Sequence, residues 1–363
     1  MTQLSQPSED PTPSGLAARW RLFRAENPKV RIRDAAARLG VSEAELVASG
    51  CGNTATRLYG DWGALVDELH ELGELMALTR NEHAVHEKTG SYGRLSRSGA
   101  IGVLLGEIDL RLFFSRWHLG FAVREEGQGG ARYSLQFFDA SGMAVHKVYL
   151  TAGSDQAAYE RLTGRYRHAD QSPFQPVLPA PKTMPQAADA AIDAVGLVAH
   201  WRALQDTHDF ADLLTRFGAG RVQAFRLVGD DLARRVGLSA PRRMLETCAA
   251  AGLDLMLFVA SPGAVQIHTG PVHNLKALGP WFNVLDERFS LHLRETALTS
   301  AWVVHKPTRD GVVSSLEVFD GDGVLVCQLF GRRKPGQAED LRWREILAAL
   351  PDADETPQSG EEN

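Results

Sequence analysis

Apolar residues in this chain follow two different spacings, one typical of helices and one typical of strands. Between 210 and 217, Phe and Leu recur at positions i, i+3, i+4 and i+7, which predicts an amphipathic helix that ends at Gly218. Between 289 and 293, Phe and Leu instead alternate with Ser and His, which predicts a half-buried strand. The segment Ser261-Pro262-Gly263 separates two apolar runs and predicts a hairpin turn.

The chain also repeats itself at a long interval. Leu75-Met76 recurs as Leu255-Met256, 180 positions later, and Trp20-Arg21 recurs as Trp201-Arg202, 181 positions later. A repeat of this length is a duplicated domain rather than a short solenoid unit. The site of function is therefore expected where the two copies differ or where they meet.

Each half places its predicted helices before its predicted strands. This order argues for α+β halves with antiparallel sheets and against a doubly wound parallel fold. The apolar linker residues Phe174, Val177 and Leu178 are candidates to pack along a groove. The expected organisation is a first repeat over 14–165, a Pro-rich linker over 166–190, a second repeat over 191–350, and disordered tails at 1–13 and 351–363.

Composition narrows the class of protein. The 363 residues carry a net charge of −6 and 44% hydrophobic residues, which is ordinary for a soluble protein and argues against a nucleic-acid partner. We expect neither a signal peptide nor membrane insertion. The cysteines Cys51, Cys248 and Cys327 are too far apart for a metal clip and odd in number, which favours reduced thiols in a cytoplasmic protein.

Familiar catalytic signatures are missing from the sequence. It has no phosphate-binding loop, no G-x-S-x-G elbow and no H-E-x-x-H zinc motif. The close spacing of His83 and His86 suggests a pair of metal ligands. The repeat, however, places them on a strand, where residues three apart point to opposite faces. A shared ligand site at these two residues is therefore not expected.

One histidine distinguishes the second half from the first. His208 lies just before the apolar helix face, between Thr207 and Asp209, two residue types that often cap helices. The equivalent position of the first half is Asn27, so His208 is specific to the second copy. Arg221 lies thirteen residues further on and is considered for the same reason.

Several strings of the sequence resemble those of a known protein family. The strings HWRALQDTHDFADLLTRFG, RVQAFRLVGDDLA and LMLFVASPGAVQIHTG in the second half resemble the bacterial haemin-degrading and haem-trafficking family of the HemS/ChuS/PhuS type. The strings RIRDAAARLG and RNEHAVHE in the first half resemble it as well. The resemblance runs in order over residues 16–350 and includes the duplication.

The resemblance implies a haem in a cleft between the second-half helices and the sheet of the first half. His208 would be the proximal iron ligand and Arg111 the distal arginine and catalytic organiser, with Phe113 against the porphyrin. Haem iron accepts a neutral imidazole, and a single proximal histidine leaves the sixth position open. Because the first half lacks a counterpart of His208, one principal haem per chain is expected.

The resemblance also implies partners for the two haem propionates. Arg221 and Lys306 would engage these carboxylates, and arginine does so in bidentate fashion. Phe330 stands where several relatives have a tyrosine, so that hydroxyl contact is lost here. Arg333 would still line the pocket.

Two roles remain open from the sequence. The first is a cytoplasmic haem-binding protein of bacterial haem uptake that opens the haem ring and releases iron, using oxygen and an external electron donor. The alternative is a non-enzymatic chaperone that receives haem after import and passes it to a separate haem oxygenase. Both roles require the same ligand residues, so the sequence does not separate them.

Overall fold

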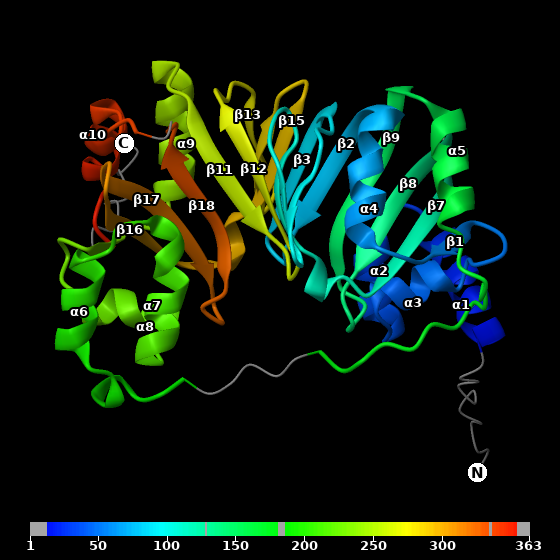
Figure 1. Ribbon diagram of the computed structural model, residues 1–363, viewed down its shortest axis with the longest axis horizontal. Helices are drawn as coiled ribbons and strands as arrows, with labels where there is room; N and C mark the ends of the chain where they lie inside the picture. Colours follow the sequence, from blue (N-terminus) through cyan, green and yellow to red (C-terminus); the bar gives the residue numbers. More distant parts are fainter. Residues whose placement is uncertain (1–12, 128, 181–185, 334–335, 354–363) are drawn as a thin grey trace, which may run out of the picture. The chain divides into compact units, whose positions relative to one another are not determined.

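The computed structural model describes residues 13–127, 129–180, 186–333 and 336–353. The chain forms two compact units, each described separately below (Figure 1). Unit 1 comprises residues 1–78, 89–181 and 261–264, and unit 2 comprises 79–88, 182–260 and 265–363. Each unit therefore contains a short hairpin segment that comes from the other half of the sequence.

Unit 1 begins with helices and continues with strands. Its helices are α1 (Pro13–Glu26), α2 (Ile32–Leu39), α3 (Glu43–Ala48), α4 (Trp62–Glu68) and α5 (Gln156–Arg165). Its strands are β1 (Ala55–Leu58), β2 (Gly73–Arg80, through residue 78), β4 (Ser96–Ser98), β5 (Ile101–Leu104), β6 (Asp109–Phe113), β7 (Leu119–Gly127), β8 (Gly130–Phe138) and β9 (Ala144–Ser154).

The strands of unit 1 pair antiparallel in two groups. One group has the order β1-β7-β8-β9-β2, and the other has the order β4-β5-β6. Leu65 of α4 and Leu162 of α5 are buried in one core cluster with strand residues such as Phe137. The short helix α3 packs with β7 in a second cluster. The helices thus bury their apolar faces against the sheet, as an α+β half requires.

Unit 2 repeats this arrangement. Its helices are α6 (Ala194–Arg202), α7 (Phe210–Phe217), α8 (Arg221–Leu227), α9 (Ala240–Ala251) and α10 (Leu341–Ala348). Its strands are β3 (Ala84–Ser91, through residue 88), β10 (Ala233–Val236), β11 (Leu255–Ala260), β12 (Ala264–Gly270, from residue 265), β13 (Leu275–Leu278), β14 (Trp281–Leu285), β15 (Phe289–Arg294), β16 (Leu298–Thr308), β17 (Gly311–Asp320) and β18 (Leu325–Gly331).

The strand orders of unit 2 match those of unit 1. They are β10-β16-β17-β18-β11-β12 and β3-β15-β14-β13, again antiparallel. The first five strands correspond one for one to β1-β7-β8-β9-β2, and β13 to β15 correspond to β4 to β6. The predicted α+β class and the duplication are therefore confirmed, as are the helix that Gly218 ends, the strand at 289–293 and the hairpin around Pro262.

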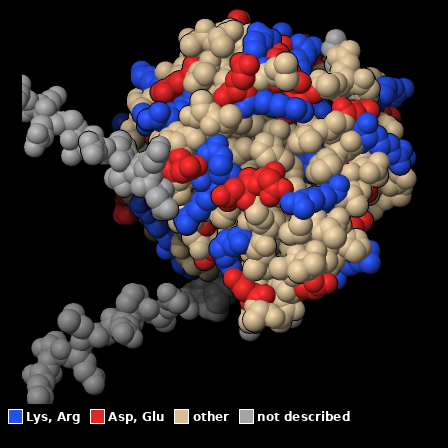
Figure 2. Space-filling view, turned by 90° about the vertical axis from the view of Figure 1, so that its left-hand side faces the viewer, with Lys and Arg blue, Asp and Glu red and all other residues tan. Residues whose placement is uncertain are grey.

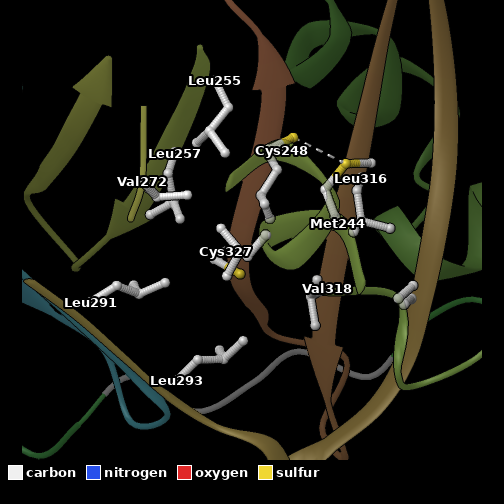
Figure 3. Close-up of a cluster of buried hydrophobic side chains, with 14 of the residues drawn as sticks. Met244, Cys248, Leu255, Leu257, Val272, Leu291, Leu293, Leu316, Val318 and Cys327 are labelled. Carbon is white, nitrogen blue, oxygen red and sulfur yellow. Dashed lines mark hydrogen bonds between the residues drawn. The ribbon is translucent and has the colours of Figure 1, made fainter. Parts of the chain in front are cut away.

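Strands β16 and β17 are buried on both faces. On one face, Leu316 and Val318 join a cluster with Met244 and Cys248 of α9 (Figure 3). On the other face, Trp302 of β16 packs with apolar residues of α6, α7 and α8. These helices lie beside the two strands in Figure 1. This second face carries the candidate site of unit 2.

Residues 166–180 of the segment between the repeats belong to unit 1. Of the three apolar residues expected to pack there, Val177 contacts the α3 cluster, whereas Phe174 and Leu178 are exposed. Residues 181–185, and the tails at 1–12 and 354–363, lie outside the described residues. Asp352, within the predicted C-terminal tail, forms an isolated bridge with Val236 of β10.

Acidic and basic side chains are interspersed on the face of the molecule that Figure 2 shows. Unit 2 carries exposed ion pairs of this kind, such as Arg202 with Asp231 at 2.8 Å and Arg342 with Asp340 at 2.6 Å. Exposed pairs contribute about 0–1 kcal/mol each, so the stability of the unit comes mainly from its core.

Within the described residues, no helix has the length and apolarity needed to cross a membrane.

Candidate functional site

His208 lies on a short 3₁₀ turn, Thr207–Asp209, directly before α7. Its side chain is 88% exposed, and its Nδ1 atom lies 2.6 Å from Oδ1 of Asp206. The carboxylate accepts the Nδ1 proton, which fixes the ring and leaves Nε2 as the free electron-pair donor. An exposed imidazole held in this way has the free lone pair that a metal ligand requires.

Asp206 also holds the turn itself. Its Oδ1 accepts the backbone N–H of His208 at 2.9 Å, so Asp206 caps the 3₁₀ turn, while Asp209 occupies the N-cap position of α7 without a side-chain cap hydrogen bond. These two hydrogen bonds, together with the more distant charge of Arg333, hold the pKa of Asp206 below its usual range. The carboxylate therefore stays ionised as the partner of the histidine ring.

Phe330 lies on β18 of unit 2. Strand pairing places it opposite Ser315 of β17 and Met256 of β11, and its ring lies 5.0 Å from that of Phe258 in an edge-on arrangement. Arg333 follows the strand and is half-buried. Both predicted residues thus belong to the unit that carries His208.

A buried ionic cluster lies between α8 and the strands β16 and β17. The carboxylate of Glu317 accepts hydrogen bonds from Lys306 Nζ at 2.5 Å and from Arg221 Nε and Nη2 at 2.6 and 3.0 Å. Ser315 Oγ donates a fourth bond at 3.2 Å. The ring of Phe210, the first residue of α7, lies against both cations, 4.6 Å from Lys306 Nζ and 5.1 Å from Arg221 Cζ. The cluster therefore also holds the start of α7, two residues after His208.

The pKa values of both buried members of the cluster, Lys306 and Glu317, are lowered, but for different reasons. Burial lowers the pKa of Lys306 to about 8, and the nearby Arg221 adds to this, although Glu317 opposes it. Burial by itself raises the pKa of Glu317, but the charges of Arg221 and Lys306 outweigh this and hold the pKa well below its usual range. Glu317 is therefore a permanent internal anion.

The remaining predicted residues lie on β6 in unit 1. Asp109, Arg111 and Phe113 alternate with the buried Leu110 and Leu112, so they share the more exposed face of the strand. Arg111 Nη1 donates to the carboxylate of Asp109 and, at 3.2 Å, to the carbonyl of Leu110. Burial raises the pKa of Asp109, and Arg111 partly offsets this. Arg111 is thus an oriented guanidinium next to the exposed ring of Phe113.

The structure therefore gathers the predicted residues into two groups. His208, Arg221, Lys306, Phe330 and Arg333 belong to unit 2, and Arg111 and Phe113 belong to unit 1. Sequence reasoning missed the carboxylates that hold them, namely Asp206, Glu317 and Asp109. For Asp206 and Asp109 the signal was available, because each lies two positions from the residue that it holds. Glu317 has no such local signal.

His83 and His86 make separate contacts in unit 2. His83 Nε2 lies 3.5 Å from Oδ2 of Asp320, and the ring of His86 lies 5.0 Å from that of Phe289. His86 is on β3, while His83 immediately precedes this strand. Within the described residues, no group of three or more His, Cys, Asp or Glu side chains is placed to hold a metal ion.

Comparison with known proteins identifies the family. The model of the haemin-degrading HemS.ChuX domain matches residues 40–166 and 218–350, one match in each half. The hemin transport protein HemS of Yersinia enterocolitica is 41% identical over 335 residues, which cover 91% of this chain and 96% of that protein. The hemin transport protein HmuS of Yersinia pestis is 42% identical over 330 residues, 90% of this chain and 94% of that protein.

Solved structures agree with this assignment. Holo-PhuS, a heme-binding protein from Pseudomonas aeruginosa, superimposes with a TM-score of 0.92 at 47% identity, covering 94% of this chain and 99% of that one. ChuS, an E. coli heme oxygenase, superimposes with a TM-score of 0.84 at 37% identity, covering 92% and 99%. The fold thus defines a duplicated α+β protein of the HemS.ChuX class. The chain belongs to the haemin-degrading HemS.ChuX family.

The residues present fit a haem. An exposed imidazole with a free Nε2 suits an iron ligand, and a carboxylate on the other ring nitrogen is the usual support for such a ligand. Arg221 keeps part of its side chain exposed, as a group that meets a propionate must. Phe113 offers an exposed aromatic face of the kind that a porphyrin packs against.

Proposed function

We propose that this protein binds haem in the cytoplasm as part of bacterial haem uptake, with His208 as the axial ligand of the iron. The observation that carries the proposal is the exposed imidazole whose Nδ1 atom is held by Asp206 at 2.6 Å. The names of the relatives, two hemin transport proteins and a heme-binding protein, support the same ligand.

Each further residue has a role in this proposal. Asp206 accepts the Nδ1 proton of His208, which fixes the orientation of the ring and directs the Nε2 lone pair to the iron. Arg111, held by Asp109, presents N–H donors on the distal side, and Phe113 packs against the ring. Arg221, Lys306 and Arg333 supply positive charge for the propionate carboxylates, while Phe330 adds an apolar wall. The first half has Asn27 in place of His208, so we propose one principal haem per chain.

The finer proposal is that the protein opens the haem ring and releases iron. Haem supplies the oxygen chemistry when it is bound, as substrate and cofactor at once. The protein would hold the ring through His208 and orient the distal side through Arg111, and an external electron donor would be required. The relative named as a heme oxygenase supports this role.

The second candidate is a haem chaperone that delivers intact haem to an acceptor, such as a separate haem oxygenase. The relatives named as hemin transport and heme-binding proteins favour it. Both candidates use the same ligand residues, and only the fate of the bound haem separates them.

The experiment that tests these roles follows bound haemin by absorbance after a reductant is added, with catalase present to remove free peroxide. Catalytic formation of an open-chain tetrapyrrole supports the enzyme. Haem that stays intact under these conditions, but transfers to an acceptor protein, supports the chaperone.

A further inference from the structure

Four donors of the buried cluster bind the Glu317 carboxylate. Its Oε1 accepts from Lys306, from Ser315 and from Arg221 Nη2, while its Oε2 accepts from Arg221 Nε. A carboxylate offers about four acceptor positions, and the four bonds of this one all come from within the cluster. All donors of the cluster that reach Glu317 are therefore fixed in place by it.

The three charged groups differ sharply in exposure. The side chains of Glu317 and Lys306 are 0% and 3% exposed, whereas that of Arg221 is 26% exposed. An incoming carboxylate can therefore reach Arg221 but not the Lys306 ammonium. The third nitrogen of Arg221, Nη1, has no hydrogen-bond partner among the described residues, which leaves one amino group of the guanidinium available.

The charge of the cluster also has a definite sign. One carboxylate and two cations leave a net charge of +1, and Arg221 is the member that meets solvent. Without Lys306, Glu317 would neutralise Arg221 and the accessible group would have little attraction for an anion. With Lys306 in place, the ammonium of Lys306 neutralises the Glu317 carboxylate, and the positive charge of Arg221 can still attract an anion.

We propose that Lys306 and Glu317 are positioning residues for Arg221, the group that contacts a haem propionate. Glu317 fixes the Nε and Nη2 edge of the guanidinium, and Lys306 compensates the charge of Glu317, so that Nη1 faces the ligand with a net positive charge. This inference rests on the proposed function, because it takes haem as the ligand. It assigns Lys306 an action through Arg221 in place of the direct propionate contact that the family resemblance implied.

The test compares two ligands, one with charged propionates and one in which methyl esterification removes this charge. Haemin and haemin dimethyl ester are titrated into the whole protein and followed at the Soret band. We expect Arg221→Gln and Lys306→Met to weaken haemin binding about tenfold each, because each removes one unit of positive charge near the carboxylate. Neither substitution should change binding of the ester.

A double variant separates indirect from direct action. In Lys306→Met with Glu317→Leu, the internal anion is lost with its partner, so the charge of Arg221 is again uncompensated. Haemin affinity should rise above that of Lys306→Met but stay below that of wild type, because Arg221 also loses the carboxylate that fixes its Nε and Nη2 edge. An affinity that stays as low as that of Lys306→Met would overturn the inference, because it would mean that Lys306 itself contacts the propionate.

The chain offers a matched control in unit 1. Lys147 and Glu43 form a buried pair of the same kind, with Nζ 2.5 Å from the carboxylate oxygen. The double variant Lys147→Met with Glu43→Gln should leave both affinities unchanged. Equal weakening of haemin and ester by Lys306→Met would mean a merely structural role and would also overturn the inference. If wild type shows no Soret response to haemin, the proposed function itself has failed.

Discussion

The buried cluster around Glu317 predicts an unequal response to the loss of its members. In Glu317→Ala, the Lys306 ammonium is left 2% exposed without its anion, beside the positive charge of Arg221. In Lys306→Met, by contrast, Glu317 keeps its bidentate partner Arg221 and its bond from Ser315. We therefore expect Glu317→Ala to be strongly destabilising and Lys306→Met to be mild.

The magnitude follows from the titration of Lys306. Its pKa of about 8, against about 10.4 in the unfolded chain, already opposes folding by about 3 kcal/mol at pH 7. Without Glu317 the lysine gives up its proton, which limits this term to about 5 kcal/mol and so adds about 1–2 kcal/mol. The lost charged hydrogen bonds of Arg221 and Ser315 add about 1.5–3 kcal/mol. Glu317→Ala should therefore lower the free energy of unfolding by about 3–4 kcal/mol, and Lys306→Met by less than about 1 kcal/mol.

The sign of the pH dependence provides a second check. Because the pKa of Lys306 is lowered on folding, the unfolded chain binds more protons, and this group makes the protein more stable as pH rises from about 8 towards 10.4. The extra lysine term of Glu317→Ala should vanish by about pH 9.5, so the loss of stability in this variant should shrink by about 1–2 kcal/mol between pH 7 and 9.5. Urea unfolding at the two pH values measures this. A deficit that does not change with pH, or a Lys306→Met variant less stable than Glu317→Ala, would refute the reasoning.

Three further predictions concern single side chains. Asp206→Asn should weaken haemin binding by about 10–100-fold with little loss of stability, because the exposed carboxylate orients His208; equal affinity in a Soret titration would contradict this. Trp343→Ala should lower the free energy of unfolding by about 3–5 kcal/mol, since the ring is fully buried and its Nε1 donates to Ser314 O at 2.9 Å; chemical denaturation measures it. Tyr92→Phe should cost about 1–3 kcal/mol, because the buried Tyr92 hydroxyl lies 2.8 Å from Nε2 of His146; an unchanged urea midpoint would argue against that hydrogen bond.

Local pattern was enough to predict much of the fold. The helix at 210–217 and the strand at 289–293 follow from periodicity, which reports which face of an element is buried. The duplication followed from recurring strings. The sequence did not predict to which unit the two hairpin segments belong. Residues 79–88 pack in unit 2, and residues 261–264 pack in unit 1. Strand pairing between distant segments depends on tertiary contacts that a single repeat does not encode.

The candidate site was predictable only in part. The family resemblance supplied His208 and Arg111, and their carboxylate partners lie two positions away in the sequence. Glu317 could not be found in this way. It lies on β17, whose residues are buried on both faces, but from the sequence alone a charged residue in a strand is expected at the surface. Its partner Arg221 is 96 positions away. Such a contact becomes visible only when α8 packs on the sheet.

The central claim is that His208 is the axial ligand of a bound haem. The measurement that tests it most directly is a Soret titration of the apo-protein with haemin, with wild type beside His208→Ala. The account predicts a sharp Soret band that saturates at one haem per chain in wild type and that shifts and weakens in the variant. Identical spectra and affinities in the two proteins would contradict it, and saturation at two equivalents of equal affinity would contradict the single site.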